Sequence, residues 1–353
     1  MTQAVQPAPA PAPPEPGHAQ AGRRSVGKRF FGRPEVGSLM GAVAVFVMFF
    51  VIAEPFRHAA SLSTVLYASS TIGIVTVGVA LLMIGGEFDL SAGVAVTTSA
   101  LTAAMFAFEF TTNVWVGIVV ALALSLGIGM FNGYVLIRTR LPSFLVMLST
   151  FLMLQGLNLA VTKLVSGGVA TDSIADMDGF DSARAVFASA LTIGAVSVKV
   201  TVFWWLAFVA IATWVLLRTK VGNWIFAVGG QADSARAVGV PVKRTKIGLF
   251  MTVGFTAWFA GMHKLFAFNT VQSGEGVGQE LIFIAAAVIG GCLLTGGYGS
   301  AVGAAIGAFI FGMTGQGIVY AGWNPDWFMF FIGATLLAAT LLNLWVRNRA
   351  ARR

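Results

Sequence analysis

The segment GGEFDLSAG, residues 85–93, carries the two carboxylates best placed for chemistry, Glu87 and Asp89. They do not form a general acid/base pair, because no histidine or third polar group is placed to cooperate with them. A carboxylate at the start of a helix is favoured by exposed backbone N–H groups and by the helix dipole. We therefore predict that Asp89 or Ser91 caps the next helix; direct contact with a ligand is the alternative. The candidate residues of this segment are Gly85, Gly86, Glu87, Asp89, Ser91 and Gly93.

Metal and nucleotide chemistry have no matching pattern in the sequence. Cys292 is the single cysteine, and the three histidines are far apart in the chain. This excludes a disulfide framework and a multi-cysteine metal site. Residues 22–29, GRRSVGKR, resemble a phosphate-binding loop, but Arg29 replaces the hydroxyl residue that such a loop needs. We expect no catalytic residue, metal, cofactor or nucleotide site in this chain.

Neutral polar side chains interrupt several long apolar runs. Side chains of this kind mark a route across a membrane or form hydrogen bonds between helices, and the second role is the ordinary one. Because none of them is charged, they fit a neutral hydroxylated solute better than an ion or a proton relay. The candidate pathway residues are Asn132, Gln155, Asn158 and Gln316, with Asn343, Trp204, Trp205 and Phe268 as further positions.

The composition shows what surrounds these residues. Hydrophobic residues make up 57% of the 353 positions and charged residues only 10%, with a mean hydropathy of +0.84. Most of the chain must therefore face lipid or other embedded helices. We predict an all-α fold, a polytopic transmembrane helical bundle of about ten spans. The spans are expected at 38–54, 61–84, 92–108, 114–137, 142–162, 200–217, 246–268, 281–295, 299–320 and 325–346.

The basic residues predict the orientation of these spans. With both termini in the cytoplasm, most of the 22 lysines and arginines fall on the inner side. The net charge of +8 is thus a topology signal and not a nucleic-acid footprint. Residues 1–37 are proline-rich without apolar periodicity and are predicted to be a disordered cytoplasmic tail. Residues 38–346 form the membrane domain, and 347–353 form a basic cytoplasmic tail.

Two connections are longer than simple turns. The outer one, 163–199, is expected to hold a short helix around residues 181–190. In the inner one, 218–245, we predict that Asp233 caps a short helix from Ser234 to Val238, that Gly239 ends it and that Pro241 prevents it from resuming. A compact helix of this kind is either a surface that another protein grips or a solvated loop between two spans.

The inner connection resembles the coupling segment of ribose-type sugar permeases of ABC importers, which reads roughly AxGGNxxAAxxxGI. Residues 85–93 are similar to the family's GGxDLSxG segment with one inserted residue, and residues 284–299 are similar to IAAVxxGGxxLxGGxG. Residues 140–144, RLPSF, fit a fourth motif, and the matches cover about residues 60–345. Gln231, where the family has Asn, and the inserted residue indicate a distant subgroup. The residues of the coupling segment are Gly229, Gly230, Gln231, Ala232, Asp233, Ser234, Ala235, Arg236 and Gly239.

The resemblance implies a permease subunit of the bacterial inner membrane with no enzymatic activity of its own. A cytoplasmic ATPase subunit would bind ATP and grip the coupling segment, and an extracytoplasmic binding protein would deliver a monosaccharide or polyol. A second permease copy, identical or related, would complete the pathway. A secondary transporter and a polytopic membrane enzyme are the alternatives; the first normally needs ionisable residues within spans, and the second needs convergent catalytic groups.

Glycines also predict close helix packing. Gly299, Gly303 and Gly307 recur every four residues and would form one smooth helix face. In addition, Ile-Gly-Gly ends an apolar run at residues 84–86 and again at 289–291. This repetition suggests a duplicated unit of parallel orientation with discontinuous helices near the pathway.

Overall fold

The computed structural model describes residues 34–194 and 196–351 of the chain. Most of the predicted N-terminal tail, residues 1–33, lies outside the described residues. Helix α2 (Pro34–Ile52) begins four residues before the predicted span 38–54, so residues 34–37 are helical. Proline suits the first turn of a helix, because its missing N–H would have no partner there.

Seven of the described helices are long and apolar enough to cross a membrane. They correspond to the predicted spans, with ends shifted by a few residues. They are α2, α3 (Ala59–Ile84), α4 (Ala92–Phe110), α5 (Val114–Thr139), α6 (Ser143–Ser166), α8 (Val200–Arg218) and α12 (Ala301–Tyr320).

The other three predicted spans are helices of a different character. Helix α10 (Val242–Phe268) is long but begins with basic residues, and α13 (Trp327–Ala351) continues into the predicted C-terminal tail. Helix α11 (Gln279–Ile289) has 11 residues. At 1.5 Å per residue it is about 17 Å long, against roughly 30 Å for the hydrocarbon core. The prediction of a full span at 281–295 is therefore wrong, because a glycine turn ends the helix at Ile289.

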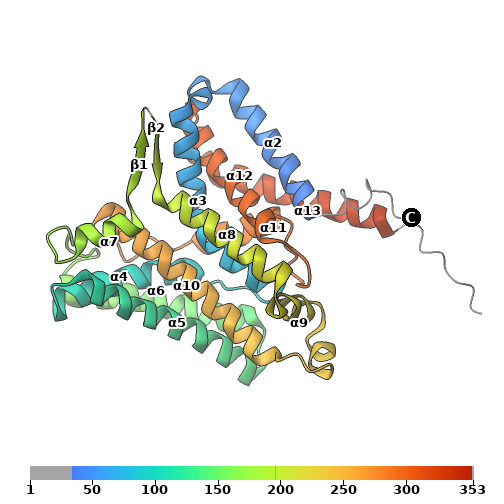
Figure 1. Cartoon of the computed structure of the whole chain (residues 1–353), viewed down its shortest axis with the longest axis horizontal. Coiled ribbons are helices and arrows are strands. Elements are labelled where there is room, and N and C mark those ends of the chain that lie inside the picture. Colours follow the sequence, from blue (N-terminus) through green and yellow to red (C-terminus); the bar gives the residue numbers. More distant parts are fainter. Residues whose placement is uncertain (1–33, 195, 352–353) are drawn as a thin grey trace, which may run out of the picture. The chain divides into compact units, whose positions relative to one another are not determined.

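The connection 163–199 contains more structure than was predicted. Helix α7 (Phe180–Phe187) lies where a short helix was expected. The strands β1 (Ala190–Ile193) and β2 (Val196–Lys199) then form an antiparallel hairpin that leads directly into α8 (Figure 1). A single turn of 3-10 helix, η1 (Glu54–Arg57), joins α2 to α3. Apart from this hairpin, the regular elements of the described chain are helices, as the sequence predicts.

Helix α3 is the most enclosed element. Every residue from Gly73 to Ile84 is buried. It packs against α12, α10, α8 and α11, while α10 also packs along α5 and α4. Side chains on α3 therefore face protein on all sides at its C-terminal end, and its last turn is positioned by several neighbours at once.

Candidate functional site

Three glycine pairs from distant parts of the chain meet at the C-terminal end of α3. The backbone N–H of Gly297, before α12, donates to the carbonyl of Ile84 at 2.8 Å. A Cβ on Gly229 would lie 1.8 Å from that carbonyl oxygen and 2.6 Å from the nitrogen of Gly297. A Cβ on Gly296 would lie 2.5 Å from Cα of Gly86. The backbones thus touch without intervening side chains; we call Ile84, Gly86, Gly229, Gly296 and Gly297 the glycine junction.

Gly229 belongs to α9 (Lys220–Ala237), which fills much of the connection predicted as a loop. The helix contacts α8, α10 and α3 (Figure 1). Gln231 has φ −159° and ψ 101° and divides it into two parts. The second part, residues 232–237, is the short helix predicted from the sequence, and we call it the coupling helix. It starts earlier than predicted, because the extended Gln231 and not Asp233 precedes it. Asp233 instead forms an exposed ion pair with Arg236 at 3.2 Å.

The coupling helix ends at a glycine turn, as predicted. Gly239 has φ +87°, its N–H donates to Arg236, and the N–H of Val240 donates to the carbonyl of Ala235. This is a Schellman turn, which needs a residue without a Cβ penalty at the left-handed position. The short helix does not resume after Gly239, because Pro241 has ψ 67° and is not helical; α10 begins at the next residue as a separate helix, earlier than the predicted span at 246.

The coupling helix has one buried and one exposed face. Ala235 is buried and packs with Val228 and Val242. Gln231, Asp233, Ser234 and Arg236 are exposed, Ala232 is half-buried, and Val238, the residue directly after the helix, is 80% exposed. One face therefore fixes the helix to α10, and the other presents an uncovered apolar residue among polar ones.

The chain makes the same backbone turn at the ends of α3 and α11. Gly86 and Gly291 have φ +85° and +92°. In each turn the N–H of the second glycine donates to the carbonyl of the residue three positions earlier. The N–H of the residue after that glycine donates to the carbonyl five positions before itself. The same turn also follows the coupling helix at Gly239 and α12 at Gly322, so it is a general helix end in this chain, and the internal repeat stays a prediction.

Both carboxylates of residues 85–93 have partners. Glu87 forms an ion pair with Lys246 of α10, and both side chains are largely buried. Asp89 is buried, and its Oδ1 accepts from the backbone N–H of Ser91 at 2.7 Å and from the Ser91 hydroxyl at 2.6 Å. Ser91 occupies the N-cap position of α4 but makes no capping bond of its own. Asp89 thus bonds to the residue that precedes α4, and no described side chain caps the N–H groups of the helix itself, so the predicted cap is not formed.

A chain of hydrogen bonds continues from this start into two neighbouring helices. Asn132 of α5 donates to the Ser91 hydroxyl at 3.1 Å and accepts from Thr150 of α6 at 2.8 Å. Asn158 of α6 accepts from Thr98 of α4 at 2.9 Å. Both asparagines are buried. They have the interhelical bonding role that the sequence analysis set beside a pathway role.

The remaining polar and aromatic candidates lie outside this network. Gln155 and Gln316 are half-buried, and Phe268 is 65% exposed. The indole of Trp204 donates to the carbonyl of Val186 at 3.0 Å, whereas Trp205 is buried against Gly73 of α3. The side chain of Asn343 lies outside the described residues.

Two of the three glycines predicted to pack a helix do so. A Cβ on Gly303 would lie 2.0 Å from the carbonyl oxygen of Gly290, and one on Gly307 would lie 2.0 Å from that of Ala286. Helix α12 thereby lies directly against α11. Gly299 precedes the N-cap residue Ser300 and is outside the helix, so its inclusion in the helix face was wrong; it faces Cys292 and Ile84 instead.

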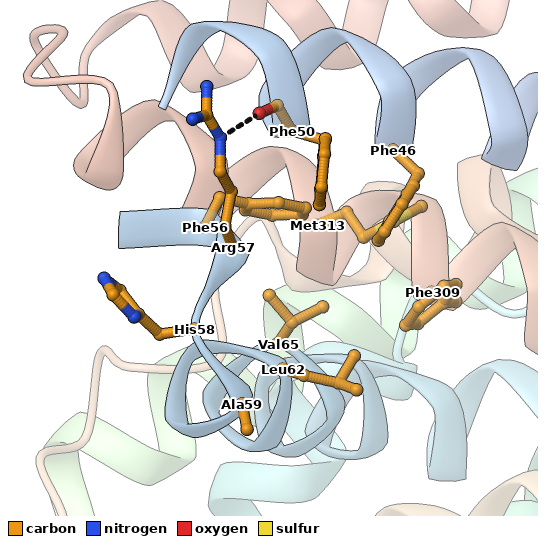
Figure 2. Close-up of a pocket in the computed structure, with 10 residues that line it drawn as sticks. All are labelled: Phe46, Phe50, Phe56, Arg57, His58, Ala59, Leu62, Val65, Phe309 and Met313. Atoms are coloured by element: carbon orange, nitrogen blue, oxygen red, sulfur yellow. Dashed lines mark hydrogen bonds between the residues drawn. The ribbon is translucent and has the colours of Figure 1, made fainter. Parts of the chain in front are cut away.

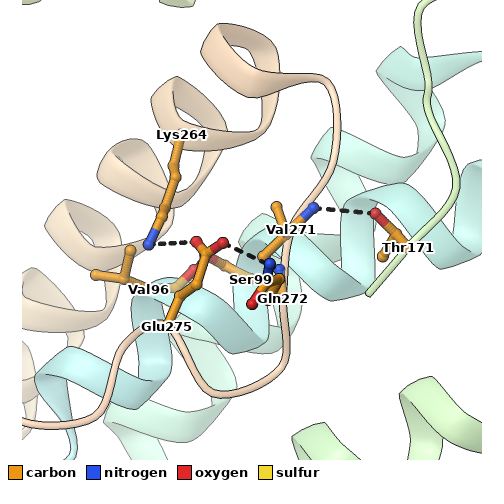
Figure 3. Close-up of polar contacts among 7 residues, drawn as sticks. All are labelled: Val96, Ser99, Thr171, Lys264, Val271, Gln272 and Glu275. Carbon is orange, nitrogen blue, oxygen red and sulfur yellow. Dashed lines mark hydrogen bonds and ion pairs between the residues drawn. The ribbon is translucent and has the colours of Figure 1, made fainter. Parts of the chain in front are cut away.

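At the opposite end of α10, the segment 269–278 is tied to two other parts of the chain. Lys264 of α10 forms an ion pair with Glu275 at 2.5 Å, and the N–H of Val271 donates to the Thr171 hydroxyl at 3.1 Å (Figure 3). The backbone of Thr171 bonds to Val271 in return. No sequence signal points to this arrangement, because its partners are far apart in the chain and share no motif.

An apolar pocket of about 200 Å³ lies between α2, η1, α3 and α12, apart from the motif residues. Figure 2 shows Arg57 at its rim, where Nε donates to the carbonyl of Phe50 at 2.7 Å. Within the described part of the chain, no group of three or more metal-binding side chains is present. No residue of the segments 85–93 and 284–299 lines this pocket. Residues of both segments meet at the glycine junction, and the first segment continues to the start of α4.

Comparison with known proteins decides the family. Residues 61–340 match the family model described as "Branched-chain amino acid transport system / permease component". The chain belongs to this family of transport permeases. Together with the seven apolar helices, this makes it a multi-pass protein of the bacterial inner membrane.

Curated relatives cover nearly the whole permease. The ribose import permease RbsC of Escherichia coli K12 is 29% identical over 90% of this chain and 97% of its own length. The galactose/methyl galactoside import permease MglC of the same organism is 28% identical over 90% and 96%. The fructose import permease FrcC of Rhizobium meliloti is 28% identical over 85% and 82%. No solved structure matches the chain.

Proposed function

We propose that this chain forms the translocation pathway of an ATP-driven importer for a monosaccharide or a related polyol. The permease family and the names of the sugar-importing relatives support the solute class. The observation that carries the mechanism is the glycine junction. It joins the helix that leads to the coupling helix directly to the end of α3 and to the loop between α11 and α12.

The proposed topology has ten membrane segments with both termini in the cytoplasm. The segments are α2, α3, α4, α5, α6, α8, α10, α11, α12 and α13, with α11 crossing only part of the bilayer. The concentration of lysine and arginine near α9 and the start of α10 supports a cytoplasmic position for the coupling helix. The segments 163–199 and 269–278 then face the outside.

The coupling helix is the proposed contact for the ATPase subunit. Its buried residue Ala235 packs against Val228 and Val242, so a push on its exposed face is passed to the first part of α9 and to α10. Val238 is the apolar anchor on that exposed face. An exposed apolar residue surrounded by polar ones is typical of a protein contact, because burying it there gains free energy.

Movement of the coupling helix would reach the pathway through backbone contacts. Gly229 touches the last carbonyl of α3 and the loop before α12, and tightly packed backbones transmit displacement and do not absorb it. Two permease copies would enclose the pathway and alternate between outward and inward states by rigid-body motion. ATP is bound by the partner subunit, and a binding protein delivers solute to the outer segments.

Co-purification with the ATPase subunit tests the docking surface. Val238→Asp should abolish co-purification and ATP-dependent uptake of labelled ribose, galactose or fructose, because it places a charge at the apolar contact. Val169→Asp, also at an exposed valine but in the outer connection, is the matched control for docking and should retain co-purification with the ATPase subunit. ATP-independent uptake, or uptake of leucine but none of the sugars, would contradict the proposed function.

A further inference from the structure

Helix α4 meets the start of α11 and the segment just before it, along a contact that brings two backbones together. A Cβ on Gly93 of α4 would lie 2.5 Å from the carbonyl oxygen of Gly276 and 2.5 Å from Oε2 of Glu280. A Cβ on Gly276 would lie 2.2 Å from the carbonyl oxygen of Gly93 and 2.6 Å from Oγ1 of Thr97. We call Gly93, Thr97, Gly276 and Glu280 the α4–α11 seam. The seam is closed in this structure.

Two buried polar atoms in the seam lack hydrogen-bond partners. Glu280 is 6% exposed and Thr97 is 1% exposed. Among the described residues, neither Oε2 of Glu280 nor Oγ1 of Thr97 has a partner. A buried polar group without a partner is costly, and most such groups in folded proteins are satisfied. These two atoms come from different helices and face the same glycine contact.

Helix capping accounts for only one of the two oxygens of the Glu280 carboxylate. Its Oε1 accepts from the backbone N–H of Gly278 at 3.1 Å, which satisfies one free donor at the start of α11. Oε2 takes no part in this cap. The second oxygen is left buried where α4 meets the start of α11, and the Thr97 hydroxyl is buried without a partner at the same contact.

The seam lies between the outer segments and the glycine junction. Glu280 follows the segment 269–278, which is tied to Lys264 and Thr171. Helix α11 then runs about 15 Å to the turn at Gly290 and Gly291. Glu280 is therefore separated from the junction end of α11 by about half the thickness of a hydrocarbon core, which is roughly 30 Å.

We propose that Glu280 and Thr97 bind a hydroxyl group of the transported solute when α4 and α11 separate. This inference rests on the proposed function. A solute hydroxyl donates its hydrogen to Oε2 of Glu280 and accepts one from Thr97, so a single hydroxyl satisfies both atoms. The glycines at 93 and 276 let the seam close without a side chain between the helices. An apolar solute offers neither bond and leaves both atoms unsatisfied.

Deoxy sugars provide the test. Uptake of ribose, galactose and fructose is measured with the complete importer, and the transported sugar is then compared with its monodeoxy analogues. Wild-type importer should discriminate against one analogue by about tenfold or more, since a hydrogen bond to a charged group contributes that much. Glu280→Met and Thr97→Val remove the polar atoms at similar volume and should lower this ratio by about tenfold, to the preference of the binding protein alone. The binding protein is the same in every sample, so its own preference does not change between variants.

Thr98→Val is the control, because Thr98 lies one residue further along α4 and bonds to Asn158 outside the seam. It should keep the wild-type ratio. If Glu280→Met does not reach the membrane, Thr97→Val decides the question by the same ratio. An unchanged ratio in a transporting variant, or no discrimination by the wild type, overturns the hydroxyl site and leaves the proposed function intact. Failure of the wild type to take up any of the three sugars with ATP rejects the proposed function itself.

Discussion

Replacing Gly229 by alanine should separate ATP hydrolysis from transport. The added Cβ would lie 1.8 Å from the carbonyl oxygen of Ile84. Real Cβ contacts are not shorter than 3.0 Å, so the two backbones must move apart by at least 3.0 − 1.8 = 1.2 Å. Overpacking of this kind costs about 1–3 kcal/mol. A shift of that size also stretches the bond from Gly297 to Ile84, now 2.8 Å long.

Gly230→Ala is the matched control for this change. It lies next to Gly229 in the same helix, but a Cβ there meets no atom within 4 Å. Alanine raises helix propensity at both positions by a similar amount, about 1 kcal/mol, so the comparison isolates the junction contact.

The assay is ATP-dependent sugar uptake and ATPase activity of the reconstituted importer. We expect Gly229→Ala to lower the number of sugars transported per ATP by about tenfold, which corresponds to 1.4 kcal/mol, within the overpacking range. Gly230→Ala should behave as wild type. Equal coupling ratios in the two variants would refute the reasoning that the glycine junction transmits the motion.

Three further predictions concern stability. Glu87→Gln leaves Lys246 largely buried without its counter-charge and should lower the unfolding temperature in detergent, whereas the double variant with Lys246→Met should recover most of the loss. Asn132→Leu should lower the free energy of unfolding in detergent by about 1–3 kcal/mol, because it breaks the bonds to Ser91 and Thr150. Gln155→Leu, at a half-buried position, should lower it much less, and equal losses in the two variants would count against the network. Gly239→Ala should destabilise the coupling helix by about 1 kcal/mol, since φ is +87°, and should speed limited proteolysis near residue 239; unchanged cleavage would argue against the glycine turn.

Local sequence signals predicted several features of the site well. Gly239 ends the coupling helix, and Ile-Gly-Gly ends both α3 and α11, because a left-handed backbone turn depends on the residue that makes it. The predicted start of the coupling helix was less accurate, because Gln231 and not Asp233 precedes it. Gln231 breaks α9 through its extended backbone, and nothing in its side chain distinguishes it from the helix-forming residues around it.

The polar residues show where sequence reasoning stops. Asn132 and Asn158 stood out because they interrupt apolar runs. The sequence did not decide whether they line the pathway or form hydrogen bonds between helices. Their partners, Ser91, Thr150 and Thr98, are known only from the folded chain. Glu280 was not singled out at all, since a carboxylate at the start of a helix is the expected capping pattern. Its unpartnered oxygen became visible only with α4 beside it.

The sequence alone determined that this chain is a polytopic helical membrane protein, where most of its helices lie and where glycine turns end them. These properties depend on neighbours along the chain and on transfer of apolar residues out of water. Tertiary structure decided that Gly86, Gly229 and Gly296 share one junction, that α11 is too short to cross the bilayer, and that Glu280 and Thr97 are buried at the same glycine contact. Contacts between distant segments depend on how helices pack against one another, and no pattern within a single segment specifies them.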